Sequence, residues 1–252
     1  FETINERGVG LNAMDLLKNL LFSNAREDDF AVIKDTWRDM LKGLDNSGEG
    51  DKPLRFLRYF LMARYHNGVI REDEIYKWMI SSEGKARIKY QSNPVSFAKE
   101  LKAAAHTYAK FVKATNAWDA DSDFPNITGI GYLSKKTSRQ HLVLLMALPD
   151  NVSKDVANLL AKNIESLVFY YAVNRTLTKS YEALFANWAA ILRNVKLLED
   201  LKNFLRTEFN AELTEQQDKF SSQFATKSQG DLNPQYRIKY ILGRVEEYIR
   251  QK

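Results

Sequence analysis

Apolar residues recur at three- and four-residue spacing along most of the chain, which is the period of helices that bury one face. Glycine and proline, which interrupt helices, number only 11 and 5 among 252 residues. The pattern predicts an all-α fold, an irregular multi-helix bundle of about ten helices, with a short strand remnant at residues 1–4. The expected helices follow Asn12, begin at Pro53, and otherwise lie near residues 28–41, 71–81, 94–115, 136–148, 153–173, 180–192, 197–209, 214–224 and 234–250.

Three polar segments separate these helices: residues 43–52 are expected to form a flexible loop, residues 84–92 are polar and basic, and residues 118–131 are expected to be irregular. The last is the longest of the three and contains one proline and two glycines. We therefore expect it to subdivide the helical region.

Composition limits the class of protein. The chain has no cysteine, which excludes a disulfide framework, a thiolate metal site and a cysteine nucleophile. No apolar run approaches the roughly 20 residues of a membrane-spanning helix, and the first residues lack the basic and apolar regions of a signal peptide. We therefore expect a soluble, cytoplasmic protein that does not bind a membrane. The net charge of +5 permits nucleic-acid binding but does not require it.

Residues with catalytic or metal-binding chemistry do not form a known pattern. The three histidines, His66, His106 and His141, are expected on or near different helices, so a metal site would need a chance meeting in space. A phosphate-binding glycine loop and a serine nucleophile elbow are both absent. We predict no catalytic residue, no metal site and no cofactor within this chain.

One acidic segment partly matches a calcium-binding loop. Asp119, Asp121 and Asp123 alternate as at the start of such a loop. Phe124 stands where the loop needs glycine, and Ile130 stands where it needs glutamate. A solvated loop explains this segment better than a cation site does.

A row of cations stands out on the helix expected at 94–115. Its members follow one another at spacings of three, four, four and three residues: Lys99, Lys102, His106, Lys110 and Lys113. At about 100° per residue they fall within a stripe of roughly 80°, opposite an apolar face. Such a stripe suits nucleic-acid phosphates, because lysines that neutralise phosphates release counterions. The alternative is an ordinary solvated helix face.

The two ends of the chain resemble a known family. Residues 1–8 (FETINERG), then Leu11 and residues 15–19 (DLLKN), are similar to a segment of GmrSD-type restriction endonucleases, which have a ParB/sulfiredoxin-like N-terminal domain. In that family the segment closes the NTP-using domain, a long helical region follows, and many members end in an HNH nuclease domain. Residues 237–248 are similar to the helix that commonly leads into that nuclease domain.

The resemblance implies a position within a larger protein. Residues 1–25 would be the C-terminal remnant of the ParB-like domain, and residues 26–252 a helical domain. The family's Asp-Gly-Gln-Gln-Arg motif and its HNH motif are absent here and are expected upstream and downstream. The chain would thus be the helical connecting region of an NTP-dependent DNA restriction protein, itself inactive. Its partners would be DNA and the missing N-terminal and C-terminal domains, with NTP and a divalent metal used by the parent protein.

The opening motif also predicts a ligand contact. By the resemblance, Asn5, Arg7 and Gly8 lie at the edge of the nucleotide pocket. Asn5 and Arg7 offer hydrogen-bond donors suited to phosphate, and Gly8 tolerates a positive φ. The alternative for these residues is a plain strand–turn–helix joint with an exposed arginine. The alternative for the whole chain is a stand-alone helical protein-interaction module without a nucleic-acid role.

Overall fold

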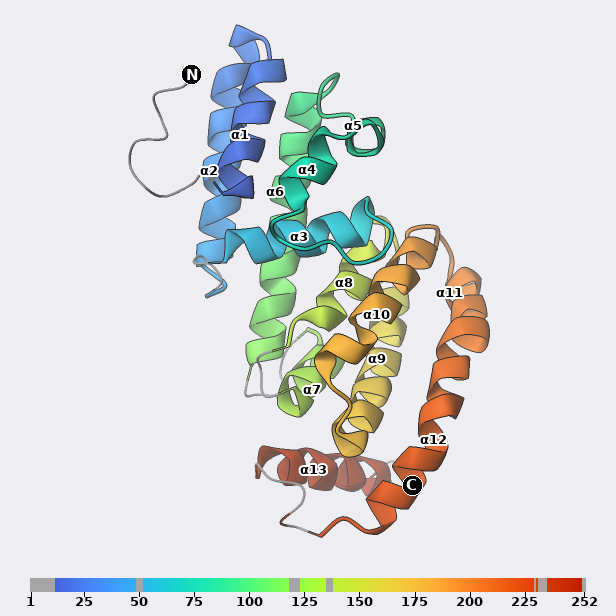
Figure 1. Ribbon diagram of the computed structural model, residues 1–252. Helices are drawn as coiled ribbons and strands as arrows, with labels where there is room; N and C mark the ends of the chain where they lie inside the picture. Colours follow the sequence, from blue (N-terminus) through green and yellow to red (C-terminus); the bar gives the residue numbers. More distant parts are fainter. Residues whose placement is uncertain are drawn as a thin grey trace. The chain divides into compact units, whose positions relative to one another are not determined.

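The computed structural model describes residues 12–48, 52–117, 123–134, 138–228, 230 and 235–250. The structure is 78% helical, and every regular element in these ranges is a helix (Figure 1). The predicted all-α fold is therefore confirmed, whereas the strand remnant expected at residues 1–4 lies outside the described ranges. None of the described helices is long and apolar enough to cross a membrane.

The chain divides into two compact units. The N-unit ends at Lys110 and the C-unit begins at Phe111, so the division falls within helix α6. We describe each unit by itself.

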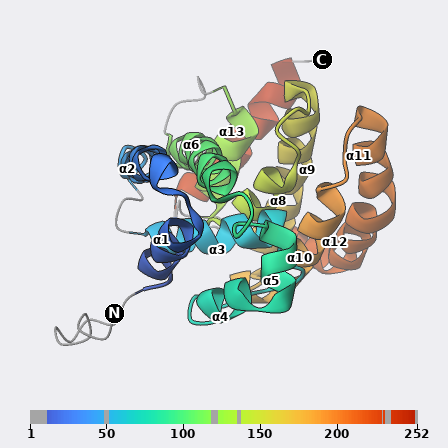
Figure 2. The same cartoon turned by 90° about the horizontal axis from the view of Figure 1, so that it is seen from above.

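The N-unit is built on three helices that run alongside one another, α1, α2 and α6, with α3 lying across them (Figures 1 and 2). Its elements are α1 (Ala13–Asn24), a 3₁₀ turn (Glu27–Asp29), α2 (Phe30–Asp45), α3 (Pro53–Arg64), α4 (Ile75–Ile80), α5 (Ser82–Ile88) and most of α6 (Pro94–Asn116).

Local sequence signals set where two of these helices begin. The Asn12 side chain caps α1, because its Oδ1 accepts hydrogen bonds from the amides of Met14 at 2.8 Å and Asp15 at 3.1 Å. Pro53 occupies the first turn of α3, where a missing N–H removes no helical hydrogen bond. Both starts were predicted from the sequence.

Aromatic rings hold the centre of the N-unit together. Phe56 and Phe60 on α3 pack against Tyr108 and Phe97 on α6, with ring centroids 5.5 and 6.0 Å apart. All four side chains are almost fully buried. This aromatic contact positions α6 and thereby decides which of its faces meets solvent.

The polar and basic segment at residues 84–92 includes most of helix α5, which the sequence did not predict. Ser81 caps this short helix by accepting a hydrogen bond from the Gly84 amide at 3.1 Å. Gly84 and Ile88 are buried, and the helix ends at Lys89 in the left-handed region, with φ 58°. Only two buried positions distinguish this helix from a polar loop, so its apolar periodicity was too weak to recognise.

The C-unit contains the end of α6 and the remaining helices. These are α7 (Pro125–Leu133), α8 (Gln140–Ala147), α9 (Lys154–Asn174), α10 (Thr178–Leu192), α11 (Leu198–Phe204), a π-helical turn (Leu205–Phe209), α12 (Asn210–Ala225) and α13 (Tyr236–Arg250). The break expected between residues 209 and 214 is absent, because the π-helical turn joins α11 directly to α12.

Helix α7 corrects the prediction that residues 118–131 are irregular throughout. Its two glycines are typical of a loop in the sequence, but packing requires them within this helix. A Cβ atom on Gly131 would lie 1.9 Å from the carbonyl oxygen of Thr115, and one on Gly129 would lie 1.9 Å from the carboxylate of Glu165. Glycine is present here because α7 approaches α6 and α9 so closely, not because the chain turns.

Candidate nucleic-acid interface

The cationic stripe lies on α6, and most of it is open to solvent. Lys99, His106 and Lys110 are exposed, Lys102 is half-buried, and Lys113 is exposed on the part of α6 that belongs to the C-unit. The opposite side of the helix is buried through Phe97, Leu101, Tyr108, Phe111 and Val112. Helix α6 thus has the apolar and cationic faces that its residue spacing predicted.

One lysine of the stripe has an acidic partner. Lys102 Nζ lies 2.8 Å from Asp39 Oδ2 on α2. The hydrogen bond from Lys102 lowers the pKa of the Asp39 carboxyl below its usual value, with smaller contributions from Arg38 and Lys42. Lys99, Lys110 and Lys113 form no ion pair with any described residue. Three lysines, rather than the expected four, are therefore available to an external phosphate.

His106 lies against the backbone of α2. A Cβ atom placed on Gly43 would be 3.5 Å from His106 Cε1, so the ring sits directly over this glycine. Gly43 is buried and His106 is exposed. The ring therefore fills the space between α2 and α6, and part of it remains exposed to solvent. Lys102 and Lys110 lie one helical turn before and after His106 on α6.

A polar hollow of 600 Å³ opens at the start of α6, within the N-unit. Its walls come from the end of α1, the 3₁₀ turn and the first turns of α6: Asn24, Arg26, Asp29, Ser92, Asn93, Pro94, Val95, Ser96 and Lys99. Arg26 already forms an ion pair with Asp29, with 3.3 Å between Nε and Oδ2. Lys99 therefore joins the exposed stripe to a hollow lined mostly by polar groups.

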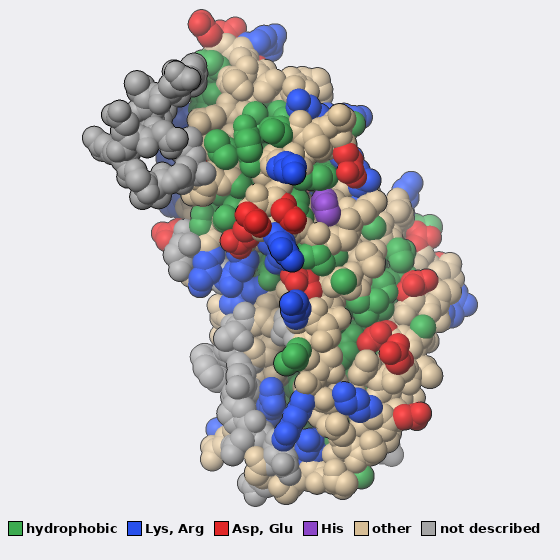
Figure 3. All heavy atoms as spheres, in the orientation of Figure 1, with side chains coloured by type: hydrophobic (Ala, Val, Ile, Leu, Met, Phe, Trp, Pro, Cys, Tyr) green, Lys and Arg blue, Asp and Glu red, His purple; other side chains and the backbone are tan. Residues whose placement is uncertain are grey.

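Acidic groups interrupt the basic character elsewhere. On the face drawn in Figure 3, Lys and Arg side chains lie next to Asp and Glu side chains in several places. Arg87 pairs with Glu83 at 3.0 Å, which removes one of the cations near Lys85 and Lys89 from an extended basic surface. On α6, by contrast, Lys99, Lys110 and Lys113 have no acidic partner among the described residues.

Most of the remaining sequence candidates lie outside the part of the chain that the structure describes. Asn5, Arg7 and Gly8 lie outside the described residues, as do Asp119 and Asp121. The described residues contain no group of three His, Asp or Glu side chains arranged to hold a metal ion.

Two of the histidines, His66 and His141, take part in packing and hydrogen bonding within the fold. The ring of His66 packs edge-on against Trp78, with centroids 5.1 Å apart. His141 is buried, and its Nε2 lies 3.0 Å from Thr115 Oγ1. The Thr115 hydroxyl donates its only proton to the Phe111 carbonyl at 2.8 Å, so the histidine must donate Nε2–H to Thr115. Burial, with a smaller effect of Arg139, lowers the pKa of His141 to about 3, and the ring is neutral at physiological pH.

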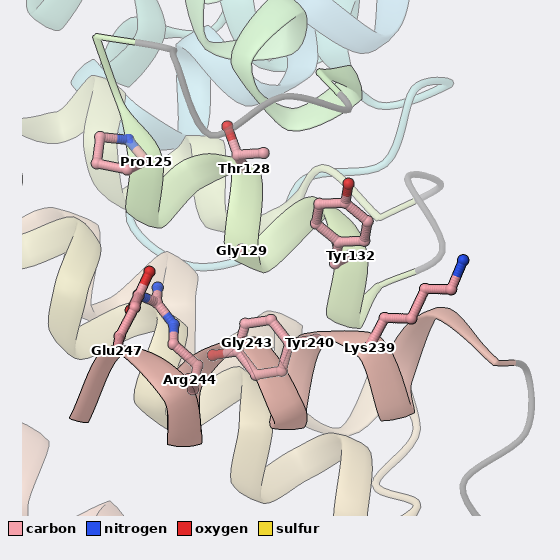
Figure 4. Close-up of a pocket in the computed structure, with 9 residues that line it drawn as sticks. All are labelled: Pro125, Thr128, Gly129, Tyr132, Lys239, Tyr240, Gly243, Arg244 and Glu247. Carbon is pink, nitrogen blue, oxygen red and sulfur yellow. The ribbon is translucent and has the colours of Figure 1, made fainter. Parts of the chain in front are cut away.

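The sequence did not predict a second site, a pocket of 260 Å³ between α7 and α13 in the C-unit (Figure 4). It is lined by Pro125, Thr128, Gly129, Tyr132, Lys239, Tyr240, Gly243, Arg244 and Glu247. Figure 4 shows Tyr240 and Arg244 reaching from α13 toward α7, with Arg244 beside Glu247 and Lys239 extending away from that pair.

A buried carboxylate lies behind this pocket. Glu165 on α9 has a side chain only 5% exposed, and it accepts hydrogen bonds from Asn126 at 2.6 Å, from Tyr240 at 2.8 Å and from Arg244. Arg244 also pairs with Glu247 at 2.6 Å. Burial and the adjacent Glu165 raise the pKa of the Tyr240 hydroxyl. Because Arg244 is already shared by two acids, this arrangement serves to attach α13 rather than to bind an anion.

The sequence did contain a signal for Glu165. It lies among Ile164, Leu167 and Val168 on the predicted helix at 153–173, where an acid on a buried face needs partners. Its partners come from residues 126, 240 and 244, so only the tertiary structure identifies them.

Comparison with known proteins adds no assignment: no protein-family model, curated protein or solved structure matches the chain. The resemblance to GmrSD-type restriction endonucleases therefore stays a prediction.

Proposed function

We propose that this chain is the helical connecting region of a GmrSD-like, NTP-dependent DNA restriction protein, and that α6 contacts the DNA backbone. The observation that carries the DNA contact is the row of exposed cations on α6. Lys99, Lys110 and Lys113 have no acidic partner among the described residues, and His106 lies between them in the sequence. The similarity of residues 1–8 and 237–248 to that family supports the rest of the proposal.

The dimensions of the row suit a nucleic-acid backbone. Lys99 and Lys113 are fourteen residues apart on one helix, which corresponds to about 21 Å at 1.5 Å per residue. Duplex DNA carries roughly twelve phosphates over that length, at one charge per about 1.7 Å. Lysine is a flexible point charge that meets a phosphate without demanding a fixed geometry. The contact would therefore be weak and independent of base sequence.

In this proposal, nucleotide hydrolysis and DNA cleavage take place in other domains of the parent protein. The nucleotide and the divalent metal would act in the preceding and following domains, with Asn5, Arg7 and Gly8 at the edge of the nucleotide pocket. The chain would connect those domains and hold DNA near them. Its own residues would bind and orient the substrate without cleaving it.

Salt-dependent DNA binding tests the proposal. Fluorescence anisotropy with a labelled duplex should give a log–log salt slope near −2.7, from three lysines at about −0.9 each. The triple variant Lys99→Gln, Lys110→Gln, Lys113→Gln should flatten this slope and keep its helicity, because glutamine is nearly as good a helix former as lysine. A matched control changes three exposed lysines on other helices, Lys162, Lys179 and Lys219, to glutamine. Equal slopes for the two triple variants, or no binding by the parent, would overturn the DNA contact.

The alternative function, a helical protein-interaction module without a nucleic-acid role, also has one observation in its favour. Helix α13 exposes Leu242, Val245, Tyr248 and Ile249, which are between 50% and 66% accessible. Absence of DNA binding together with self-association through this helix would favour that alternative.

A further inference from the structure

One face of helix α13 is attached to the C-unit, and the other face is exposed and apolar. Tyr240 and Arg244 attach one face to the C-unit through Glu165, and Tyr240 also packs against Phe169 with centroids 6.0 Å apart. The other face carries large apolar side chains in solvent, including Leu242 at 62% and Ile249 at 66% exposure. Large apolar groups gathered on one exposed face commonly mark an interaction surface.

The exposed apolar residues have the spacing of a coiled-coil seam. Ile238, Leu242, Val245 and Ile249 follow one another at intervals of four, three and four residues. At about 100° per residue they lie within a stripe of roughly 60° along the helix. Ile238 is half-buried and the other three are exposed. Alternating intervals of three and four residues allow two helices to pack their apolar seams together.

The charges beside this seam are self-complementary. Lys239 and Glu246 are seven residues apart, so they lie on the same flank of the seam, and both are exposed. The other flank carries Ile241 and Tyr248, which are uncharged. In an antiparallel helix pair like flanks face each other, so Lys239 of one copy meets Glu246 of the other, twice over by symmetry. In a parallel pair each charged flank would face an uncharged one.

We propose that two copies of this chain associate through antiparallel α13 helices. Ile238 then packs opposite Ile249 of the second copy, Leu242 packs opposite Val245, and two Lys239–Glu246 pairs border the seam. Helix α13 has 15 residues, about 22 Å, which makes a small interface and a weak dimer unless other surfaces contribute. The proposal does not depend on nucleic acid or on the family resemblance.

Charge reversal tests the partner and the orientation together. Sedimentation velocity from about 1 to 300 µM covers the range of weak dimers. Lys239→Glu or Glu246→Lys alone should weaken the dimer about ten-fold, because two attractive pairs become repulsive. The double variant Lys239→Glu, Glu246→Lys restores opposite charges and should return the dimer to within about three-fold of the parent. Leu242→Gln with Val245→Gln should abolish it.

Glu246 also pairs with Arg250 within the helix at 2.5 Å, so circular dichroism must show equal helicity for all variants. Because the chain has no cysteine, introduced thiols report orientation directly. An equimolar mixture of Leu242→Cys and Val245→Cys proteins should crosslink mainly as the mixed pair. The proposal is overturned if the chain is monomeric at every concentration, or if the dimer survives Leu242→Gln with Val245→Gln. It is also overturned if the double charge variant dimerises as weakly as the single variants, or if crosslinks form mainly between two copies of the same cysteine variant.

Discussion

The two units treat polar side chains differently. Apart from aromatic side chains, the described part of the N-unit buries only Thr36 and Ser47 as polar side chains, and its Asp39–Lys102 ion pair lies at the surface. The C-unit buries several more, some of them ionisable: Thr115, Thr128, Arg139, Gln140, His141, Glu165 and Asn174.

The difference shows two ways of positioning helices. Aromatic and aliphatic packing places α3 against α6 in the N-unit, and such contacts tolerate changes at the surface. In the C-unit, buried hydrogen bonds connect helices that are far apart in the sequence, as Glu165 does for α7, α9 and α13. A buried polar group left without its partner is costly, so single substitutions should matter more in the C-unit.

The largest effect is expected at Glu165. Changing Glu165 to Ala leaves Asn126, Tyr240 and Arg244 without their shared acceptor. We expect unfolding free energy to fall by about 2–4 kcal/mol, less than for a fully buried pair because the Arg244 side chain is 36% exposed. Urea denaturation measures the loss, and hydrogen exchange should become faster across residues 236–250.

Glu247 provides the matched control for this prediction. It pairs with the same arginine, but its side chain is 56% exposed, so Glu247→Ala should cost less than about 1 kcal/mol. Similar losses for the two variants would show that burial of Glu165 does not decide the strength of the attachment.

The next effect depends on pH and concerns His141. Its folded pKa of about 3 lies below the unfolded value of about 6.5, so the unfolded chain binds the proton more readily. The contribution of the neutral ring is complete above pH 6.5 and is lost as the pH falls from 6.5 toward 3. At pH 5, about 1.5 pH units below the unfolded pKa, the free energy of unfolding should therefore be lower by about 2 kcal/mol, at about 1.36 kcal/mol per pH unit.

His141→Gln removes this titration and keeps an N–H that can reach Thr115. The variant should be less stable than the parent at pH 7.5, and the difference between their free energies of unfolding should become smaller as the pH falls to 5. Urea denaturation at pH 7.5, 6.5 and 5 measures this difference. A constant difference over this range would mean that His141 does not cause acid sensitivity.

The smallest effect on stability is expected at Asp39 in the N-unit. Asp39→Asn breaks a surface ion pair, so urea denaturation should detect little or no change. The same change releases Lys102, and the log–log salt slope of DNA binding should steepen from about −2.7 to about −3.6. An unchanged slope would show that Lys102 does not face the same phosphates as Lys99, Lys110 and Lys113.

The sequence by itself determined most of the helical architecture and the two faces of α6. Asn12 and Pro53 mark helix starts by local hydrogen bonding and ring geometry, which need no distant partner. The spacing of Lys99, Lys110 and Lys113 against the apolar side depends only on the period of a helix. These features were predictable because each is decided within a few turns of chain.

Only the tertiary structure decided features that join distant residues. Positions 129 and 131 of helix α7 require glycine because their neighbours at 165 and 115 leave no room for a Cβ atom. Lys102 is withdrawn from the cationic stripe by Asp39, 63 residues away in the sequence. Glu165 obtains its partners from residues up to 79 positions away. Spacing along one helix predicts which side chains share a face, but ion pairs and close backbone approaches depend on which helices fold against it.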